Sequence, residues 1–187
     1  MNFIFKFFYS IYCYFFNKNI DGKIYLFSYG SNSLDQVKER INREGNIVCH
    51  PAYLDNFIRI FAGQSAKWND GGVATIYPVK GQKCYGLALE VTEDELLLMD
   101  EFENGYYRSI QKVRMENGKS IRVNIYIKKK NEFLYFPSEK YLEAINKMLN
   151  DRSSDKDRKI MIRGLVNGKI VGFGSWSKKD GFSIMKK

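Results

Sequence analysis

The sequence is poor in the side chains that build metal centres, disulfide frameworks and nucleophile–histidine pairs. It has one histidine, His50, and three cysteines, Cys13, Cys49 and Cys84, among 187 residues. An odd number of cysteines without a C-x-x-C spacing argues against a disulfide framework and against a zinc site. The single histidine precedes Pro51, which predicts a loop position and a surface or structural role. We therefore expect reduced thiols, a cytoplasmic location and no metal or other cofactor.

Long apolar runs are also scarce, and the one near the N-terminus has an unusual composition. Residues 3–16 contain nine aromatic residues, interrupted by Lys6 and Ser10. The run is shorter than the about 20 residues that a transmembrane helix needs, and it lacks the charged start and the cleavage site of a signal peptide. Three interpretations stay open: an extension that packs on the domain or stays mobile, a segment for membrane contact or targeting, and a true signal. A signal would overturn the cytoplasmic assignment.

Positive charge is in excess, but it is not gathered into the footprint of a nucleic-acid-binding protein. The net charge is +9, with 21 lysines and nine arginines. The lysines are scattered, apart from short runs at residues 128–130, 178–179 and 186–187. A nucleic-acid module usually has a basic stripe interleaved with aromatics, or a recognisable motif, and neither is found. We predict no nucleic-acid partner, while a basic surface could speed the arrival of anionic small molecules.

An apolar run followed by a tight turn forms the first informative segment. Residues 24–27 are β-branched and aromatic, which predicts a buried strand, and a Tyr-Gly-Ser-Asn turn follows at residues 29–32. Ser33 stands three residues before Gln36, a capping-box spacing that predicts a helix over residues 34–43. The N–H groups of this junction, at the positive end of the helix dipole, would bind an anion such as a substrate carboxylate. The alternative is an ordinary strand-to-helix turn.

The second informative segment is a short predicted helix with an acid on its apolar face. A capping-box spacing begins at Thr92, and an Asn-Gly pair at residues 104–105 suits a C-terminal stop. At about 100° per residue, Glu103 points within roughly 40° of the apolar Leu96. An acid on that face is desolvated, which suits a group that takes up and returns a proton. The alternatives are a fraying last turn that frees Glu103 into water, or a buried pair with Arg108.

The rest of the chain predicts two hairpins and one more helix. Residues 106–115 and 120–128 alternate like strands around an Asn-Gly turn, and residues 160–166 and 169–174 form a second hairpin of unknown role. A helix begins at Ser138 and runs through residue 149, and its spacing puts Tyr141 on the inward face. Plain packing is the alternative role for Tyr141.

The chain resembles the γ-glutamylcyclotransferase family in the two informative segments and between them. Five motifs carry the resemblance, in the family's order: the YGSN substrate loop at 29–32, the GG-(V/I)-A-T-I segment at 71–78, the following strand at 85–90, the L-D-x-x-E stretch at 98–103, and a later P-S-x-x-Y at 137–141. The resemblance covers roughly residues 23–150. Asn32 favours the branch that acts on free γ-glutamyl amino acids, because the γ-glutamylamine branch usually reads Y-G-T-L and the glutathione-specific branch Y-G-S-L.

The resemblance implies one domain of mixed α/β (α+β) type, with a β-barrel core and flanking helices. We divide the chain into an aromatic extension over residues 1–22, a γ-glutamylcyclotransferase-like domain over residues 23–176, and a basic tail over residues 177–187. Glu103 is implied as the catalytic acid and base. The residues expected to bind substrate are Leu26, Phe27, Ser28, Tyr29, Gly30, Ser31, Asn32 and Tyr141.

The implied reaction is intramolecular and needs no cofactor. The α-amine of a γ-glutamyl amino acid attacks its own γ-carbonyl, which releases 5-oxoproline and a free amino acid. Glu103 can accept the proton of the ammonium and return it to the leaving amine, so the enzyme would be a cyclising lyase or acyltransferase. The alternatives are a γ-glutamylamine cyclotransferase and a non-enzymatic binder on the same scaffold, with a nucleic-acid-binding protein third. The leaving amine and the oligomeric state stay open, a homodimer being one option.

Overall fold

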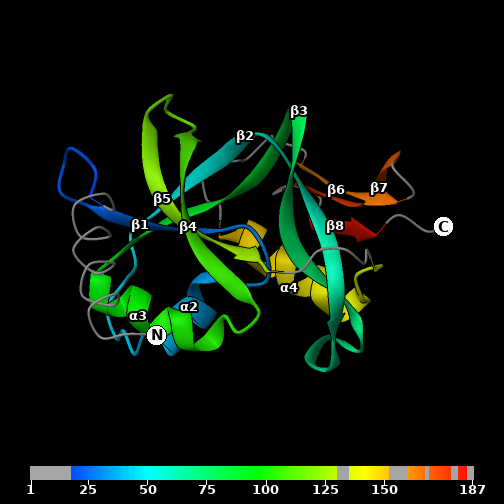
Figure 1. Cartoon of the computed structure of the whole chain (residues 1–187), viewed down its shortest axis with the longest axis horizontal. Helices are drawn as coiled ribbons and strands as arrows, with labels where there is room; N and C mark the ends of the chain where they lie inside the picture. The colour runs from blue at the N-terminus through cyan, green and yellow to red at the C-terminus, as the bar shows by residue number, and fades with distance from the viewer. Residues whose placement is uncertain (1–17, 130–134, 152–159, 167–168, 178–180, 185–187) are drawn as a thin grey trace.

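Five strands close into a barrel in the computed structural model of the protein (Figure 1). Their order around the barrel is β1-β3-β2-β4-β5. Neighbouring strands are antiparallel except β1 and β5, which pair in parallel through Leu26 and Asn124. The barrel strands are β1 Ile24–Ser28, β2 Cys49–Ser65, β3 Gly71–Val91, β4 Tyr106–Met115 and β5 Ser120–Lys128. The predicted mixed α/β domain with a barrel core is confirmed.

Within the described residues, three α-helices and a second small sheet surround this barrel. Helices α2 and α3 lie side by side against one end of the barrel, and α4 lies between the barrel and a sheet of order β6-β7-β8 (Figure 1). These elements are α2 Leu34–Arg40, the 3₁₀ turn η1 Ala66–Trp68, α3 Glu93–Phe102, α4 Glu139–Asn150, β6 Ile160–Val166, β7 Lys169–Ser177 and β8 Gly181–Ile184. The structure describes residues 18–129, 135–151, 160–166, 169–177 and 181–184.

Two of the three predicted parts of the chain, the aromatic extension and the basic tail, lie at its ends. The aromatic run at residues 3–16 lies outside the described residues, as does the predicted turn at residues 167–168. The two strands of the second hairpin are present as β6 and β7. Strand β8 lies within the segment expected to be a basic tail. No helix within the described ranges is long and apolar enough to cross a membrane.

Strand β1 and the start of α2 follow directly from the local sequence. All five residues of β1 are buried, as expected of a β-branched and aromatic run inside a barrel. The Ser33 hydroxyl accepts a hydrogen bond from the N–H of Gln36, which confirms the predicted helix start. The helix ends at Arg40, before the predicted residue 43, because Asn42 takes a left-handed conformation with φ of 52°.

The remaining helix starts and the β4–β5 hairpin also follow the predictions. Thr92 and Ser138 are N-caps, and the capping box of α3 is complete. The turn between β4 and β5 contains Gly118 with φ of 86°, a conformation that glycine adopts without a steric penalty. The loop position predicted for His50 is wrong. This residue lies in β2, with its Nε2 atom 3.1 Å from Oε1 of Glu90. The proline that follows His50 is tolerated because it stands near the beginning of the strand.

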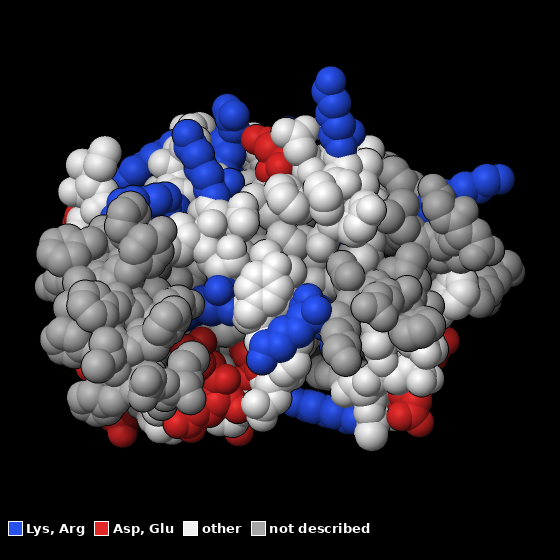
Figure 2. Space-filling model, in the orientation of Figure 1, with Lys and Arg blue, Asp and Glu red and all other residues white. Residues whose placement is uncertain are grey.

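Charged side chains of both signs share the face drawn in Figure 2. Acidic residues gather at its lower edge, where Figure 1 places α3, and most basic residues lie towards its upper edge. Several lysines and arginines are paired with acids, including Lys23 with Glu90 at 2.7 Å and Lys119 with Asp21 at 3.0 Å. These paired cations are neutralised locally, and the net charge of +9 comes from the excess of lysines and arginines over acids.

Candidate active site

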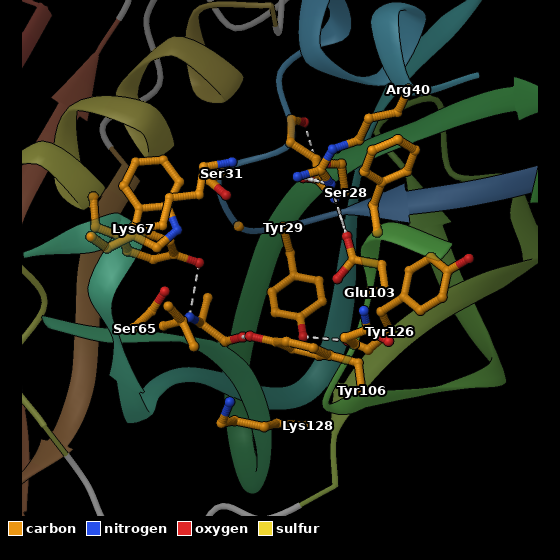
Figure 3. Close-up of a pocket in the computed structure, with 18 of the residues that line it drawn as sticks. Ser28, Tyr29, Ser31, Arg40, Ser65, Lys67, Glu103, Tyr106, Tyr126 and Lys128 are labelled. Carbon is orange, nitrogen blue, oxygen red and sulfur yellow. Dashed lines mark hydrogen bonds and ion pairs between the residues drawn. The ribbon is translucent and has the colours of Figure 1, made fainter. Parts of the chain in front are cut away.

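A cavity of about 380 Å³ opens beside the turn that follows β1 (Figure 3). Its volume falls within the range of about 300–1,000 Å³ that small-molecule sites occupy. The predicted site residues that line it are Phe27, Ser28, Tyr29, Gly30, Ser31, Asn32, Glu103 and Tyr141. Leu26, which was also predicted to bind substrate, does not line this cavity: it pairs with Leu89 and Asn124 inside the barrel and is 1% exposed.

Glu103 is the C-cap of α3, and two neighbours anchor one of its oxygens. Asn32 donates a hydrogen bond from Nδ2 to Oε1 at 3.1 Å, and Arg40 donates from Nη1 to the same oxygen at 3.0 Å. Oε2 has no partner among the described residues. The prediction that this carboxylate has apolar surroundings is wrong. The end of α3 directs it towards Arg40 of α2, and both side chains line the cavity. The alternative pair with Arg108 does not form, since Arg108 contacts Asp100 and Glu93.

Arg40 is a site residue that the sequence analysis missed. Its guanidinium group lies 5.3 Å from the ring centre of Phe102, and its Nη1 atom also donates to Oδ1 of Asn32 at 2.9 Å. Both hydrogen bonds use Nη1, so Nη2 and Nε have no partner in the part of the chain that the structure describes. A signal was present: Arg40 stands one helical turn after the buried Val37, beside the inward face of α2.

The N-terminus of α2 does not supply the anion site that was predicted for it. The N–H of Leu34 donates to Oδ2 of Asp151 at 2.8 Å, so a carboxylate of the protein already occupies this helix end. Asp151 is the C-cap of α4 and stands more than a hundred residues after Leu34 in the sequence, so no local pattern predicts the contact. The turn itself is held from within, because the Ser28 hydroxyl donates to the carbonyl oxygen of Asn32. Residues 29–32 therefore face the cavity independently of the helix dipole.

A buried tyrosine, Tyr29, and a partly buried one, Tyr106, form the wall behind Glu103 and the turn. The hydroxyl of Tyr29 donates to the carbonyl of Tyr126 at 2.6 Å, and that of Tyr106 donates to the carbonyl of Ala74 at 3.0 Å. Burial raises the pKa of Tyr29 and of Tyr106, so both stay protonated at neutral pH. The two side chains therefore shape the cavity as neutral groups and do not exchange protons with a substrate at neutral pH.

The prediction that Tyr141 points inward is confirmed. Its hydroxyl accepts a hydrogen bond from the N–H of Ala74 at 2.9 Å, and its ring lies 4.9 Å from that of Trp68. Burial also raises the pKa of this hydroxyl. A Cβ atom added at Gly30 would come within 3.2 Å of the Tyr141 oxygen, so this glycine lets the turn approach α4 closely.

A buried arginine supports the turn from behind. Arg59 is 4% exposed, and it donates from Nε to the carbonyl of Tyr29 at 2.6 Å and from Nη2 to the carbonyl of Tyr85 at 2.9 Å. No carboxylate among the described residues lies within ion-pair distance of it. A buried charge without an ionic partner is costly unless hydrogen bonds compensate it, so Arg59 ties the carbonyl of Tyr29 to that of Tyr85 on β3. Its position in the middle of β2 carried no signal of this role.

The end of β2 and the 3₁₀ turn that follows it, which the sequence left unplaced, form another side of the cavity. Gln64 and Ser65 of β2 and Lys67 and Trp68 of η1 line it. Lys128, at the end of β5, also lines it, two residues after Tyr126 and so on the same face of the strand. Among the described lining residues, the cations are Arg40, Lys67 and Lys128, and the acid is Glu103.

A family model described as gamma-glutamyl cyclotransferase, AIG2-like, matches residues 26–143, more than half of the 187-residue chain. The chain belongs to this family. No curated protein sequence matches this gamma-glutamyl cyclotransferase family member. The match spans both informative segments and ends within α4, just after Tyr141.

Solved structures of the gamma-glutamyl cyclotransferase fold resemble the chain over most of its length. A gamma-glutamyl cyclotransferase is 26% identical with a TM-score of 0.63, and an uncharacterized protein from Homo sapiens is 28% identical with a TM-score of 0.62. In each case the similarity covers 71% of this chain and 81% of the other. YkqA from Bacillus subtilis, 18% identical over 67% of this chain and 47% of its own, has a TM-score of 0.57 and shares the fold. Family and fold together support a gamma-glutamyl cyclotransferase-like function.

Proposed function

We propose that the protein is a γ-glutamylcyclotransferase that converts γ-glutamyl amino acids into 5-oxoproline and a free amino acid. The observation that carries this proposal is the state of the Glu103 carboxylate. One of its oxygens is anchored by Asn32 and Arg40, and the other has no partner among the described residues and belongs to a residue that lines the cavity. A base held in one orientation with one oxygen available is what the reaction requires.

The chemistry assigned to Glu103 is two proton transfers around one ring closure. Oε2 accepts a proton from the α-ammonium group of the substrate, which exposes the nitrogen lone pair. The amine then attacks the γ-carbonyl carbon, and a tetrahedral intermediate with an oxyanion forms. When the intermediate collapses, the original C–N bond breaks, and Glu103 passes its proton to the departing nitrogen. Glu103, again a carboxylate, takes the second proton of the ring nitrogen and passes it to the released amine, which leaves as an ammonium group, so no external acid, oxidant or water is consumed.

Binding in this proposal depends on the turn at residues 29–32 and on Arg40. The backbone N–H groups of the turn and the remaining donors of Arg40 would hold the α-carboxylate, which fixes the folded conformer that closes the ring. Arg59 supports this assignment because it clamps the carbonyl of Tyr29 and limits movement of the turn. The glycine at position 30 allows the turn to approach the ligand closely.

The non-enzymatic binder is less well supported by these contacts. A buried pair of Glu103 with Arg108 was its distinguishing feature, and Arg108 lies 3.3 Å from Asp100 instead. Glu103 pairs with Arg40, and both residues line the cavity. An ion pair at the edge of a ligand cavity leaves the carboxylate accessible to a substrate, which favours the enzyme.

The proposal is tested by incubating the purified protein with a panel of γ-glutamyl compounds and measuring 5-oxoproline. The panel holds γ-glutamyl dipeptides, glutathione and γ-glutamylamines. Release of 5-oxoproline in equal amount to free amino acid, with the dipeptides preferred, is the expected result. Preference for the amines would assign the γ-glutamylamine branch. Saturable binding by calorimetry without any product would instead assign a binding protein.

A further inference from the structure

Lys128 has the features of a cation built into the cavity for an anionic ligand. Its backbone N–H donates to Oγ1 of Thr75 at 3.1 Å, which fixes the end of β5 against β3. Its ammonium nitrogen lies 5.1 Å from the ring centre of Tyr106, and burial lowers the pKa of this amine. No carboxylate lies within ion-pair distance of Lys128 in the described ranges of the chain. A partly desolvated ammonium group without a counter-ion gains from binding one.

The backbone opposite Lys128 leaves room for this side chain. Gly63 has φ of 64°, and a Cβ atom added there would stand 2.6 Å from Cε of Lys128. The aliphatic stem of Lys128 therefore lies directly against a glycine of β2, and the ring of Tyr106 flanks it on the neighbouring strand. Its ammonium group is held at the cavity by packing and not by an ion pair.

The positions of the charges match a substrate with two carboxylates. Figure 3 draws Arg40 at the top of the cavity and Lys128 at the bottom, with Glu103 and Tyr106 between them. In the proposed reaction the α-carboxylate lies near Arg40 and the α-ammonium group near Glu103. The leaving group then extends away from Arg40. A γ-glutamyl amino acid carries its second carboxylate on that leaving group, whereas a simple γ-glutamylamine carries none.

We propose that Lys128 binds the carboxylate of the leaving amino acid and so selects γ-glutamyl amino acids and peptides over γ-glutamylamines. This inference rests on the proposed function, and it names the residue that decides the substrate class. Lys67 also lines the cavity, but its side chain is exposed and stacks on Trp68 at 5.3 Å. Its charge is therefore better solvated, and it contributes less to selection.

The test compares γ-glutamyl-alanine with γ-glutamyl-alaninamide, which has the same shape but a neutral amide in place of the second carboxylate. A hydrogen bond to a charged group contributes enough to change kcat/KM by about 10-fold or more. We expect the wild type to prefer the acid by that factor. Lys128→Met should abolish the preference by lowering kcat/KM for the acid alone, and Lys128→Arg should restore most of it. The matched control is Lys129→Met, at an exposed lysine that does not line the cavity.

The outcomes separate this inference from the proposed function. Turnover of both compounds at equal rates by the wild type, or a preference that survives Lys128→Met, overturns the role of Lys128 and leaves the cyclotransferase intact. A preference lost in Lys129→Met or in Lys67→Met to the same extent as in Lys128→Met also overturns it. No 5-oxoproline from either compound overturns the proposed function, and the role of Lys128 falls with it.

Discussion

Replacing Glu103 with glutamine tests both the chemistry and the surroundings of the proposed base. Glutamine keeps the volume and one oxygen that can accept hydrogen bonds, but it cannot take the proton of the α-ammonium group. Positioned acid–base groups contribute about 10²- to 10⁴-fold to rates, so kcat for 5-oxoproline release should fall by at least about 10²-fold. Binding of substrate, measured by calorimetry, should persist because the turn at residues 29–32 is unchanged.

The same substitution should also lower stability, and the structure decides this sign. In apolar surroundings a neutral amide would be better tolerated than a carboxylate, so Glu103→Gln would stabilise the protein. Arg40 changes this expectation, because its Nη1 atom donates to Glu103 at 3.0 Å and the two side chains are only 14% and 13% exposed. The substitution removes the negative charge but leaves an amide oxygen as an acceptor for the Arg40 cation, so the loss is about 1 kcal/mol, less than the about 1.5–3 kcal/mol that a hydrogen bond to a charged group contributes in full. For a domain of this size that lowers Tm by about 2–4 °C.

The assay pairs 5-oxoproline kinetics with thermal unfolding followed by circular dichroism. Glu101→Gln is the matched control, because Glu101 is an exposed acid of the same helix and does not line the cavity. It should leave kcat and Tm nearly unchanged. Full activity in Glu103→Gln, or equal losses in both variants, would refute the assignment of the base. An unchanged or raised Tm in Glu103→Gln would refute the stabilising role of the Arg40 contact.

Three further predictions follow from the same geometry. Because Glu103 alone carries the proposed proton transfers, activity should survive exhaustive chelation, and loss on adding EDTA with recovery on adding zinc or magnesium would contradict the mechanism. Gly30→Val should raise KM by about 10-fold or more through overpacking, because an added Cβ already meets the Tyr141 hydroxyl at 3.2 Å; unchanged kinetics would move the binding site elsewhere. A chain without residues 1–17 should melt cooperatively and keep turnover, since Asn19 retains its hydrogen bonds to the backbone of Arg122 at 3.0 and 2.8 Å. Loss of the melting transition would show that the aromatic run belongs to the core.

Local sequence patterns determined where the elements begin and which segments matter. The N-caps at Ser33, Thr92 and Ser138 and the glycine turn at Gly118 are where the patterns put them. Each of these features depends on hydrogen bonds and backbone angles within a few residues, so the identities of adjacent residues suffice to predict them. The barrel itself was expected from the family resemblance and not from these local rules.

The tertiary structure decided the surroundings of the chemical groups. Helical periodicity put Glu103 on the apolar side of its helix, but it could not reveal that Arg40 of another helix reaches the same corner. Likewise, Asp151 fills the helix end that seemed ready for a substrate, and Leu26 is covered by strands on both sides. Lys128 comes to face the cavity because β5 closes the barrel beside β1. Pairings between residues that are far apart in the sequence arise only when the barrel closes, and they set the charge and hydrogen bonding of each side chain.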